Sequence, residues 1–293
     1  MKSLSDPFFS VIIPCYNVAE SLYPTFKCLT KQSFLDFEVV FVNDGSTDKT
    51  QDLIESFTLD QKIIVINQQN KGLGAARNSA IKASSGKYIA LLDADDLWED
   101  NKLEFVHNYL KKYNSEVVCH NEYVVNDKNI IFKKNYYGPY TNYNDLFFKN
   151  NCLSPSAVTI DRNVINSVGY FTEDLELHGV EDYDMWLRMA LVNIDIKYIP
   201  QFLGSYVIHG ANMSLEYKFF DKIETLHFIH SDNIDLGQKD NVRKYKIKLF
   251  KLYMLKLKTA LQLFMFDKII SILKDIFSLT FSLNKFITLK LKG

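Results

Sequence analysis

Three aspartates follow directly on a short apolar segment in the stretch YIALLDADD, which runs from Tyr88 to Asp96. The apolar residues predict a buried strand, so Asp93, Asp95 and Asp96 lie where that strand leaves the core. Carboxylates this close together repel one another, and burying any of them costs free energy. Because successive strand side chains point to opposite faces, Asp93 and Asp95 can share one side. The motif therefore predicts a positively charged partner at the end of this strand.

A second acidic pair, Glu181 and Asp182, begins the stretch EDYDMWLR. This stretch predicts a helix with acids in its first turn, where the helix dipole favours negative charge. The spacing of Trp186 in the same stretch favours a place in the core or in the wall of an acceptor site. Lys71 and Arg77 flank the glycine-rich helix start in NKGLGAARN, and cations in this setting suit contacts to a nucleotide.

Alternating strands and helices are expected to position these residues within the first hundred positions. Apolar segments at 8–14, 37–42, 62–66 and 87–92 predict strands, and the patterns at 20–32, 46–57 and 74–83 predict helices. Because these strands are apolar throughout, we expect a mostly parallel sheet with helices on both faces. Ligands bind such sheets beyond the carboxyl ends of the strands. The loops PCYN, NDGSTD, NQQNKGLGAARN and DADD follow the four strands, so we expect them to open on one edge.

The pattern after residue 100 is less regular. Residues 115–125 and 129–134 suggest a strand pair, and residues 154–171 suggest a short strand followed by a helix with Asp161 near its start. Residues 196–209 are interpreted as two short strands, and the chain beyond Ser214 is expected to be helical. No internal repeat interrupts this order.

The composition, 47% hydrophobic and 24% charged, is that of an ordinary globular protein. The net charge of −1 gives no overall attraction to nucleic acid. Four scattered cysteines, Cys15, Cys28, Cys119 and Cys152, fit a reduced cytosolic protein better than a disulfide scaffold. The first apolar run is short and ends at Pro14, so no signal peptide is expected. No apolar run reaches the roughly 18 residues of a membrane-spanning helix.

The near-neutral net charge conceals two oppositely charged regions. From Asn241 onward the chain has 12 basic and 2 acidic residues, a net charge of +10, whereas the preceding 240 residues have a net charge of −11. In the basic region, lysines alternate with Leu, Phe, Ile and Tyr, which is typical of amphipathic helices on an anionic membrane surface. The alternative is a pair of helices that packs on the rest of the chain or on a second subunit.

Five motifs resemble, in their order and spacing, those of family 2 glycosyltransferases, the inverting enzymes of GT-A fold. They are SVIIPCYN, VVFVNDGSTDKT, NKGLGAARN, YIALLDADD and EDYDMWLR, and the resemblance covers about residues 8–210. It implies an α/β protein with a Rossmann-like, mostly parallel sheet. We therefore expect a GT-A domain over residues 1–215, with a nucleotide-binding half at 1–100 and an acceptor-binding half at 101–215. A helical, basic and amphipathic C-terminal region is expected over 216–293.

The resemblance also implies roles for individual residues on the donor side. Asp44 would accept hydrogen bonds from a uridine, with Tyr16 stacking near the base. The other implied donor-binding residues are Pro14 and Asn17, which shape the pocket, the cations Lys71 and Arg77, and Asp93, which contacts the ribose or a metal-bound water.

A divalent cation, Mn²⁺ or Mg²⁺, is implied as the positive partner, because hard oxygen ligands suit these ions and the donor diphosphate must leave as an anion. Asp95 and His209 are the implied metal ligands, and Asp96 is expected beside them or as a helix cap. Asp182 is the implied base that deprotonates the acceptor hydroxyl, and Glu181 next to it is the second implied catalytic residue.

These inferences together predict a metal-dependent, inverting and non-processive glycosyltransferase. It would move a sugar from a nucleotide-sugar, most often a UDP-sugar, to a glycan or lipid-linked glycan in bacterial surface polysaccharide synthesis. We expect it in the cytoplasm, peripheral on the inner face of the cytoplasmic membrane. Two alternatives stay open: a sugar-1-phosphate nucleotidyltransferase, which would need a glycine-rich loop with Arg and Lys where PCYN stands, and an inactive binding module of a synthase complex.

Overall fold

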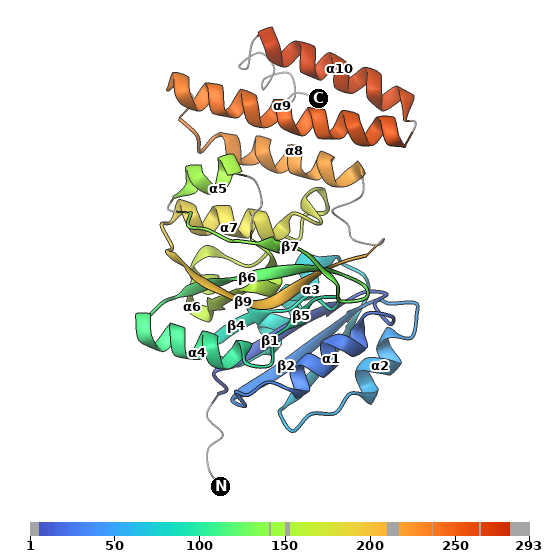
Figure 1. Ribbon diagram of the computed structural model, residues 1–293, viewed down its shortest axis with the longest axis vertical. Helices are drawn as coiled ribbons and strands as arrows, with labels where there is room; N and C mark the ends of the chain where they lie inside the picture. The colour runs from blue at the N-terminus through green and yellow to red at the C-terminus, as the bar shows by residue number, and fades with distance from the viewer. Residues whose placement is uncertain are drawn as a thin grey trace.

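The computed structural model describes residues 6–140, 142–149, 153–209, 217–235, 237–263 and 265–281. An α/β layer built around one twisted sheet forms one end of the molecule, and helices from the C-terminal region are stacked above it (Figure 1). The expected α/β fold with a helical C-terminal region is therefore confirmed. Cys152 lies outside the described residues, and the other three cysteines are buried free thiols.

The first four strands form the parallel half of the sheet in the order β3-β2-β1-β4. They are β1 (Phe9–Cys15), β2 (Phe37–Asp44), β3 (Ile63–Gln68) and β4 (Tyr88–Leu91), close to the four predicted segments. The connecting helices are α1 (Leu22–Thr30), α2 (Thr50–Ser56) and α3 (Leu73–Ala83). The second of these begins at Thr50, four residues after the predicted start at residue 46.

Alternate strand residues pack into two apolar cores on opposite faces of the sheet. Ile12 and Val40 belong to the core that includes α3, whereas Val11 and Phe41 belong to the core that includes α1. Helix α4 (Lys102–Tyr113) covers the second face through Leu103 and Val106. Because β1, β2 and β4 are buried on both faces, their sequences are mostly apolar, and the buried polar residues Ser10 of β1 and Glu38 of β2 hydrogen-bond to each other at 2.8 Å.

The sheet continues from β4 through mixed strands in the order β8-β6-β9-β5. These are β8 (Val158–Asp161), β6 (Val117–Asn126), β9 (Ile196–Ile208) and β5 (Leu97–Trp98). Strand β7 (Ile131–Asn135) pairs antiparallel with β6, so the expected strand pair is confirmed. Helix α6 (Arg162–Val168) follows β8, and the Asp161 carboxylate caps it by accepting from the Asn163 amide.

The prediction of two short strands over residues 196–209 was wrong. One long strand, β9, runs through this region, and its register against β6 shifts after the pair formed by His120 and Ile199. The shift accommodates Pro200, which has no N–H to donate to a neighbouring strand. Its carbonyl instead accepts a hydrogen bond of 2.8 Å from the Asn121 side chain, so the strand continues past the proline.

Short helices connect the sheet to the C-terminal region. They are α5 (Tyr143–Lys149), the 3₁₀ turns Pro155–Ala157 and Leu175–Leu177, and α7 (Glu181–Leu191), which begins with the predicted acidic pair. Trp186 of α7 is fully buried, and its indole nitrogen donates to the Leu153 carbonyl at 3.3 Å. Trp186 is therefore a core residue, which was one of its two expected places.

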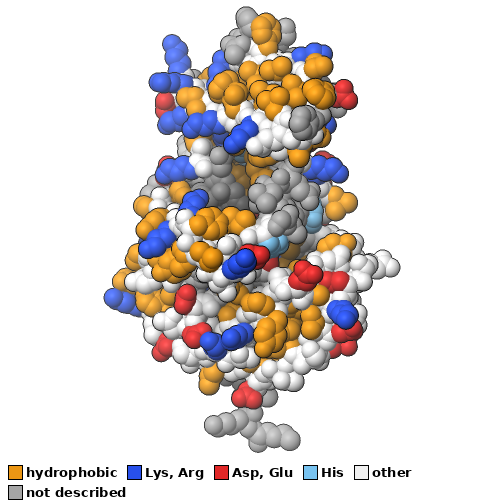
Figure 2. Space-filling view, turned by 45° about the vertical axis from the view of Figure 1, so that its right-hand side comes forward, with side chains coloured by type: hydrophobic (Ala, Val, Ile, Leu, Met, Phe, Trp, Pro, Cys, Tyr) orange, Lys and Arg blue, Asp and Glu red, His pale blue; other side chains and the backbone are white. Residues whose placement is uncertain are grey.

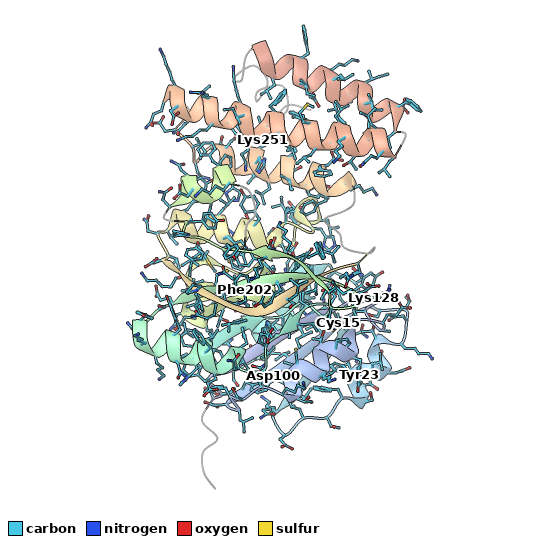
Figure 3. All side chains as sticks on the ribbon, in the orientation of Figure 1. Cys15, Tyr23, Asp100, Lys128, Phe202 and Lys251 are labelled. Atoms are coloured by element: carbon cyan, nitrogen blue, oxygen red, sulfur yellow. The ribbon has the colours of Figure 1, made fainter. Side chains whose placement is uncertain are left out.

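Three helices make up the described C-terminal region: α8 (Tyr217–Ser231), α9 (Lys239–Gln262) and α10 (Phe266–Phe281). They lie above α5 and α7, and Lys251 is found near the middle of α9 (Figures 1 and 3). Tyr245 and Leu249 of α9 share one apolar core with Trp186, so α9 packs on the rest of the chain. Glu224 of α8 accepts hydrogen bonds of 2.6 Å from Tyr253 and Lys256 of α9, which fastens these two helices together.

The outer surface of the C-terminal helices carries apolar side chains with lysines and arginines around them (Figure 2). Within the described ranges, no helix is both long enough and apolar enough to cross a lipid bilayer. Residues 282–293, which complete the basic region of the sequence, lie outside the described residues. The domain boundaries at residues 100 and 215 stay predictions.

Candidate active site

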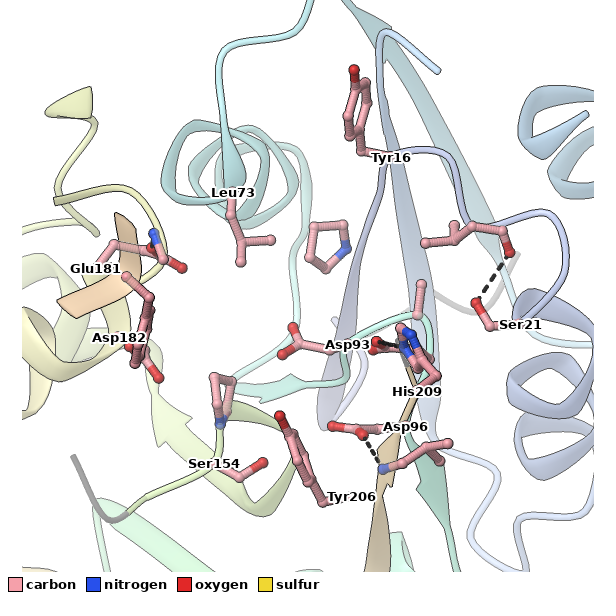
Figure 4. A pocket seen from close by; sticks show the side chains of 18 of the residues that line it. Tyr16, Ser21, Leu73, Asp93, Asp96, Ser154, Glu181, Asp182, Tyr206 and His209 are labelled. Atoms are coloured by element: carbon pink, nitrogen blue, oxygen red, sulfur yellow. Dashed lines mark hydrogen bonds and ion pairs between the residues drawn. The ribbon is translucent and has the colours of Figure 1, made fainter. Parts of the chain in front are cut away.

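A cleft of about 1710 Å³ lies at the carboxyl edge of the parallel strands. Residues from all four predicted loops line it, including Asn17, Asp44, Gly72 and Asp95, so the loops do open on one edge. The opposite wall comes from the start of α7 and from the β6–β7 hairpin. Figure 4 shows Glu181 and Asp182 on the α7 side, with Asp93 between them and His209.

Asp44 is buried at the end of β2, where it holds the loop that precedes α3. Its carboxylate accepts hydrogen bonds from the backbone amides of Lys71 and Gly72, both at 2.9 Å, and from the Gln68 side chain at 2.7 Å. Gly72 has a φ of 89°, a conformation that favours glycine, and this presents its amide to Asp44. A carboxylate has about four acceptor positions, so three partners leave capacity for a ligand.

The loop after β1 forms the outer rim of the cleft. Tyr16 is half exposed, and its ring stands at the edge of the pocket (Figure 4). The Asn17 carboxamide accepts from the Thr47 amide at 2.8 Å, which joins this loop to the one after β2. Pro14 also lines the cleft, whereas the Lys71 side chain is exposed and is not among the lining residues.

The three aspartates of DADD have different surroundings. Asp93 and Asp95 face the cleft with about a quarter of each side chain exposed, whereas Asp96 is buried. Asp96 accepts from the Ser156 hydroxyl at 2.6 Å and from the Val207 amide at 3.0 Å, so it braces β9 against the cleft floor. The proposed capping role of Asp96 is wrong, because α4 begins six residues later.

His209 lies just after β9 and meets Asp95 across the cleft floor. Its Nε2 is 2.7 Å from the Asp95 carboxylate. Burial, and then the charge of Asp93, raise the pKa of Asp95, whereas His209 acts in the opposite direction. Residues 95 and 209 are far apart in the sequence, and the pairing of β5 with β9 brings their segments together.

Arg77 of α3 connects the two walls of the cleft through ion pairs with an acid on each wall. Its guanidinium is 1% exposed and forms ion pairs with Glu181 at 2.5 Å and with Asp93 at 2.8 Å. Burial alone would lower the pKa of Arg77, but Asp93, Glu181 and Asp182 hold that pKa above its ordinary value. Arg77 therefore stays charged and fixes the position of two acids that the sequence separates widely. Its contact with a nucleotide stays a prediction.

Glu181 and Asp182 are adjacent but differ in their contacts. Glu181 is almost fully buried and also accepts from the Gly179 amide at 2.6 Å, so both of its oxygens are engaged. Asp182 lines the cleft, and one of its oxygens accepts from the Tyr183 amide at 2.6 Å. Of the two predicted catalytic acids, Asp182 is the one whose carboxylate is not held by the Arg77 ion pair.

The side chains around Asp95 could supply some of the ligands of an Mn²⁺ or Mg²⁺ ion. In the described part of the chain, no group of three or more His, Cys, Asp or Glu side chains is arranged to hold a metal ion. Ions of this kind are, however, bound by one or two carboxylates together with substrate phosphates and water. Asp95 and His209, already within 2.7 Å of each other, fit such a partial set of ligands.

Sequence reasoning missed several residues of the site. Ser156 supports Asp96, and buried Glu122 of β6 accepts from the Tyr137 hydroxyl at 2.8 Å. Burial raises the pKa of Glu122 to about 7. Part of the cleft wall also comes from α8 and α9, including Ile223 and Lys251. The sequence around Glu122 predicts only a strand, and no neighbouring residue indicates that this carboxyl group is buried.

The comparisons with known proteins agree with this geometry. The family model described as glycosyl transferase family 2 matches residues 10–169. The chain is 31% identical over 191 residues, 65% of this chain and 72% of its relative, to the UDP-Glc:alpha-D-GlcNAc-diphosphoundecaprenol beta-1,3-glucosyltransferase WfgD of Escherichia coli. Other curated relatives are longer, and the chain spans 30% and 19% of two of them.

Solved structures share the fold. TarS 1-349 of S. aureus in complex with UDP-GlcNAc has a TM-score of 0.69 at 22% identity, covering 92% of this chain and 81% of TarS. The mannosyltransferase PcManGT of Pyrobaculum calidifontis, in complex with GDP-Man and Mn²⁺, has a TM-score of 0.62 at 17% identity, covering 99% and 80% of the two chains. At these identities the likeness establishes the fold alone.

Proposed function

The chain belongs to glycosyl transferase family 2, and from this premise we propose that it transfers a sugar from a UDP-sugar to a lipid-linked glycan with inversion at the anomeric carbon. The observation that carries the proposal is the position of Asp182. Its carboxylate lines the cleft on the α7 wall, and Asp93 and Asp95 line the same cleft at the nucleotide-binding edge of the sheet. A donor bound at that edge directs its sugar toward Asp182.

The donor end of the cleft has the features that a nucleotide diphosphate needs. Asp44 provides acceptor capacity at the base of the cleft, and the exposed ring of Tyr16 offers a stacking surface for a base. The relative WfgD is named for UDP-Glc and TarS was solved with UDP-GlcNAc, which supports a UDP-sugar, whereas PcManGT, at 17% identity, was solved with GDP-Man. Pro14, Asn17, Lys71 and Arg77 keep their proposed donor-side roles.

The transfer itself requires one base. The acceptor hydroxyl gives its proton to the Asp182 carboxylate, and its oxygen attacks the anomeric carbon from the face opposite the diphosphate. The bond between that carbon and the diphosphate oxygen breaks, and UDP leaves. Arg77 and Glu181 hold the start of α7 in place during this step. Because a single displacement forms no covalent intermediate, the product has the inverted configuration.

A divalent cation would be held by Asp95 and His209, with Asp93 beside it. Such an ion neutralises the charge that develops on the leaving diphosphate. The Mn²⁺ in the PcManGT structure supports this proposal at the level of a shared fold.

The acceptor class follows from the relatives. WfgD is named for a diphosphoundecaprenol-linked GlcNAc acceptor, and a substrate of this kind is anchored in a membrane. We therefore propose that the chain builds a surface polysaccharide at the inner face of the cytoplasmic membrane. The family assignment favours glycosyl transfer over the nucleotidyl transfer considered above.

A panel of nucleotide-sugars tests the proposal directly. We expect UDP-sugars to raise the melting temperature in the presence of Mn²⁺, and one of them to be hydrolysed slowly without an acceptor. Excess EDTA should abolish turnover, and added Mn²⁺ or Mg²⁺ should restore it. Full turnover in excess EDTA would contradict the metal role. Absence of any donor hydrolysis, with UDP still bound, would instead favour an inactive binding module.

A further inference from the structure

The cleft does not end at Asp182 but continues onto the C-terminal helices. Its lining residues in this part, here called the helical arm, are Phe219, Phe220 and Ile223 of α8 and Lys248, Lys251, Leu252 and Leu255 of α9. On α9 these positions follow the three- and four-residue spacing of one helix face. The face combines two cations with two leucines, next to the aromatic residues of α8.

The two lysines of the helical arm have different surroundings. Lys248 is buried, with its Nζ 3.5 Å from the Tyr183 hydroxyl and 5.1 Å from the centre of the Phe147 ring, so its ammonium lies where α9 packs on α5 and α7. Lys251 is exposed one turn further along α9, and no carboxylate of the described residues forms an ion pair with it. Lys251 therefore offers an exposed positive charge on the acceptor side of the cleft, separate from Arg77 at the centre, and Lys248 lies behind it in the core.

The apolar residues of the helical arm extend the same surface away from the reaction centre. Leu255 is 51% exposed, although it lines a cleft, and Phe219, Phe220 and Ile223 are only partly buried. Uncovered apolar side chains in a concave site mark a place where an apolar ligand group can be buried. The order along the arm, first cations and then apolar residues, matches a ligand with an anionic head and a hydrocarbon chain.

We propose that the helical arm binds the diphosphate and the first isoprenyl units of a polyprenyl diphosphate-linked acceptor. The inference rests on the proposed function and names where its acceptor lies. With Lys251 on the diphosphate and Leu255 on the chain, the attached sugar is directed toward Asp182. A second copy of the chain or a flat membrane surface fits less well, because the arm is continuous with the reaction cleft and lies inside it.

Farnesyl diphosphate is a short, soluble probe that carries both chemical groups. Binding to the full-length protein is measured by isothermal titration calorimetry with UDP and Mn²⁺ at saturation, so that the donor diphosphate site is already occupied. We expect farnesyl diphosphate to bind, and inorganic diphosphate and farnesol to bind more weakly. Lys251→Glu and Leu255→Ser should each weaken farnesyl diphosphate binding by about tenfold, the loss expected for one charge-assisted contact or one buried leucine.

Matched controls come from the same helix. Lys258→Glu and Met254→Ser change an exposed lysine and an exposed apolar residue of α9 that do not line the cleft, so they should leave binding unchanged. Lys251→Arg keeps the charge and should retain most of the affinity.

Three results would overturn the helical arm as an acceptor site. They are no binding of farnesyl diphosphate to the unmodified protein, equal binding by Lys251→Glu and Leu255→Ser, or equal affinity for farnesol. A dimer in light scattering that Leu255→Ser dissociates would also overturn it, because the arm would then be a subunit interface. UDP affinity, measured in parallel, separates the two proposals. If the unmodified protein binds UDP but not farnesyl diphosphate, only the helical-arm proposal fails. If it does not bind UDP, the proposed function is contradicted.

Discussion

At the scale of single residues, the adjacent acids Glu181 and Asp182 have different surroundings. Glu181 is buried against Arg77, whereas Asp182 faces the cleft with its carboxylate outside that ion pair. Asp182→Asn keeps the size of the side chain and removes its basicity, so kcat should fall by about 10²–10⁴-fold with little change in UDP affinity. NMR of the product should show the inverted anomeric configuration.

Glu181→Gln serves as the comparison for this prediction. It breaks a buried ion pair from one side, which typically destabilises a protein by about 3–5 kcal/mol. We therefore expect a larger drop in melting temperature for Glu181→Gln than for Asp182→Asn. Near-normal turnover by Asp182→Asn, or a product with retained configuration, would show that Asp182 is not the base.

His120 of β6 gives a pH dependence at the same scale. Burial, and then the charge of Lys102, lower the pKa of His120 from 6.5 to about 3. The unfolded chain therefore binds a proton as the pH falls below 6.5, whereas the folded protein does not until the pH approaches 3. The stability that neutral His120 contributes is fully present above 6.5 and is lost as the pH falls toward 3. Between pH 7 and about pH 4.5, this should lower the free energy of unfolding by roughly 2–3 kcal/mol.

Urea unfolding at both pH values measures this dependence. Other groups also titrate in this range, so the informative quantity is the difference between the unmodified protein and His120→Gln. The acid loss should be about 2 kcal/mol smaller in the variant. Identical losses in the two proteins would mean that His120 does not titrate differently on folding.

At the scale of elements, the packing of α3 against the segment before α7 sets the geometry of the site. Gly74 lies in the first turn of α3, and a Cβ there would come within 2.1 Å of the Thr172 carbonyl. Gly74→Ala must therefore push this segment away from α3, and with it Glu181 away from Arg77. We expect a loss of about 1–3 kcal/mol in unfolding free energy, together with a lower kcat. Ala83→Ser, at the exposed last position of α3, should change neither quantity, and an unaffected Gly74→Ala enzyme would argue against this coupling.

At the scale of the whole molecule, the basic C-terminal region carries an apolar outer face. Phe266, Ile270, Leu273 and Phe277 of α10 are all at least half exposed, and their spacing places them on one side of the helix. Together with the net charge of +10 after residue 240, this face predicts binding to anionic membranes. Deleting the region is a poor test, because Tyr245 and other residues of α9 belong to the shared core.

A double variant, Phe266→Ser with Phe277→Ser, tests the membrane prediction without disturbing that core. It should co-sediment with phosphatidylglycerol vesicles less than the unmodified protein does, and high salt should weaken binding of the unmodified protein. Leu35→Ser changes an equally exposed apolar residue at the other end of the chain and should have no effect. If the unmodified protein, the double variant and Leu35→Ser co-sediment with vesicles equally, the apolar face of α10 does not bind membranes.

Local patterns in the sequence were enough to predict the parallel half of the sheet and the sheet edge at which the site lies. Four mostly apolar segments alternating with helices predict β1 to β4, because the strands of a parallel sheet covered by helices have mostly apolar side chains on both faces. The motif DADD identifies the end of β4 in the same way, since polar residues at the carboxyl ends of parallel strands meet at one edge. These signals depend only on neighbours along the chain.

The tertiary structure alone decided which distant residues meet. Arg77 and Glu181 are 104 positions apart, and nothing in the sequence near either one shows that they form a buried ion pair. Asp96 was expected beside the metal ligands or at a helix cap, and only the structure shows that it accepts hydrogen bonds from Ser156 and Val207. The basic, apolar pattern of α9 likewise fits a membrane surface or a packed helix equally well. Its place in the cleft wall depends on α5, α7 and α8, because the neighbours that bury one helix face come from elsewhere in the chain.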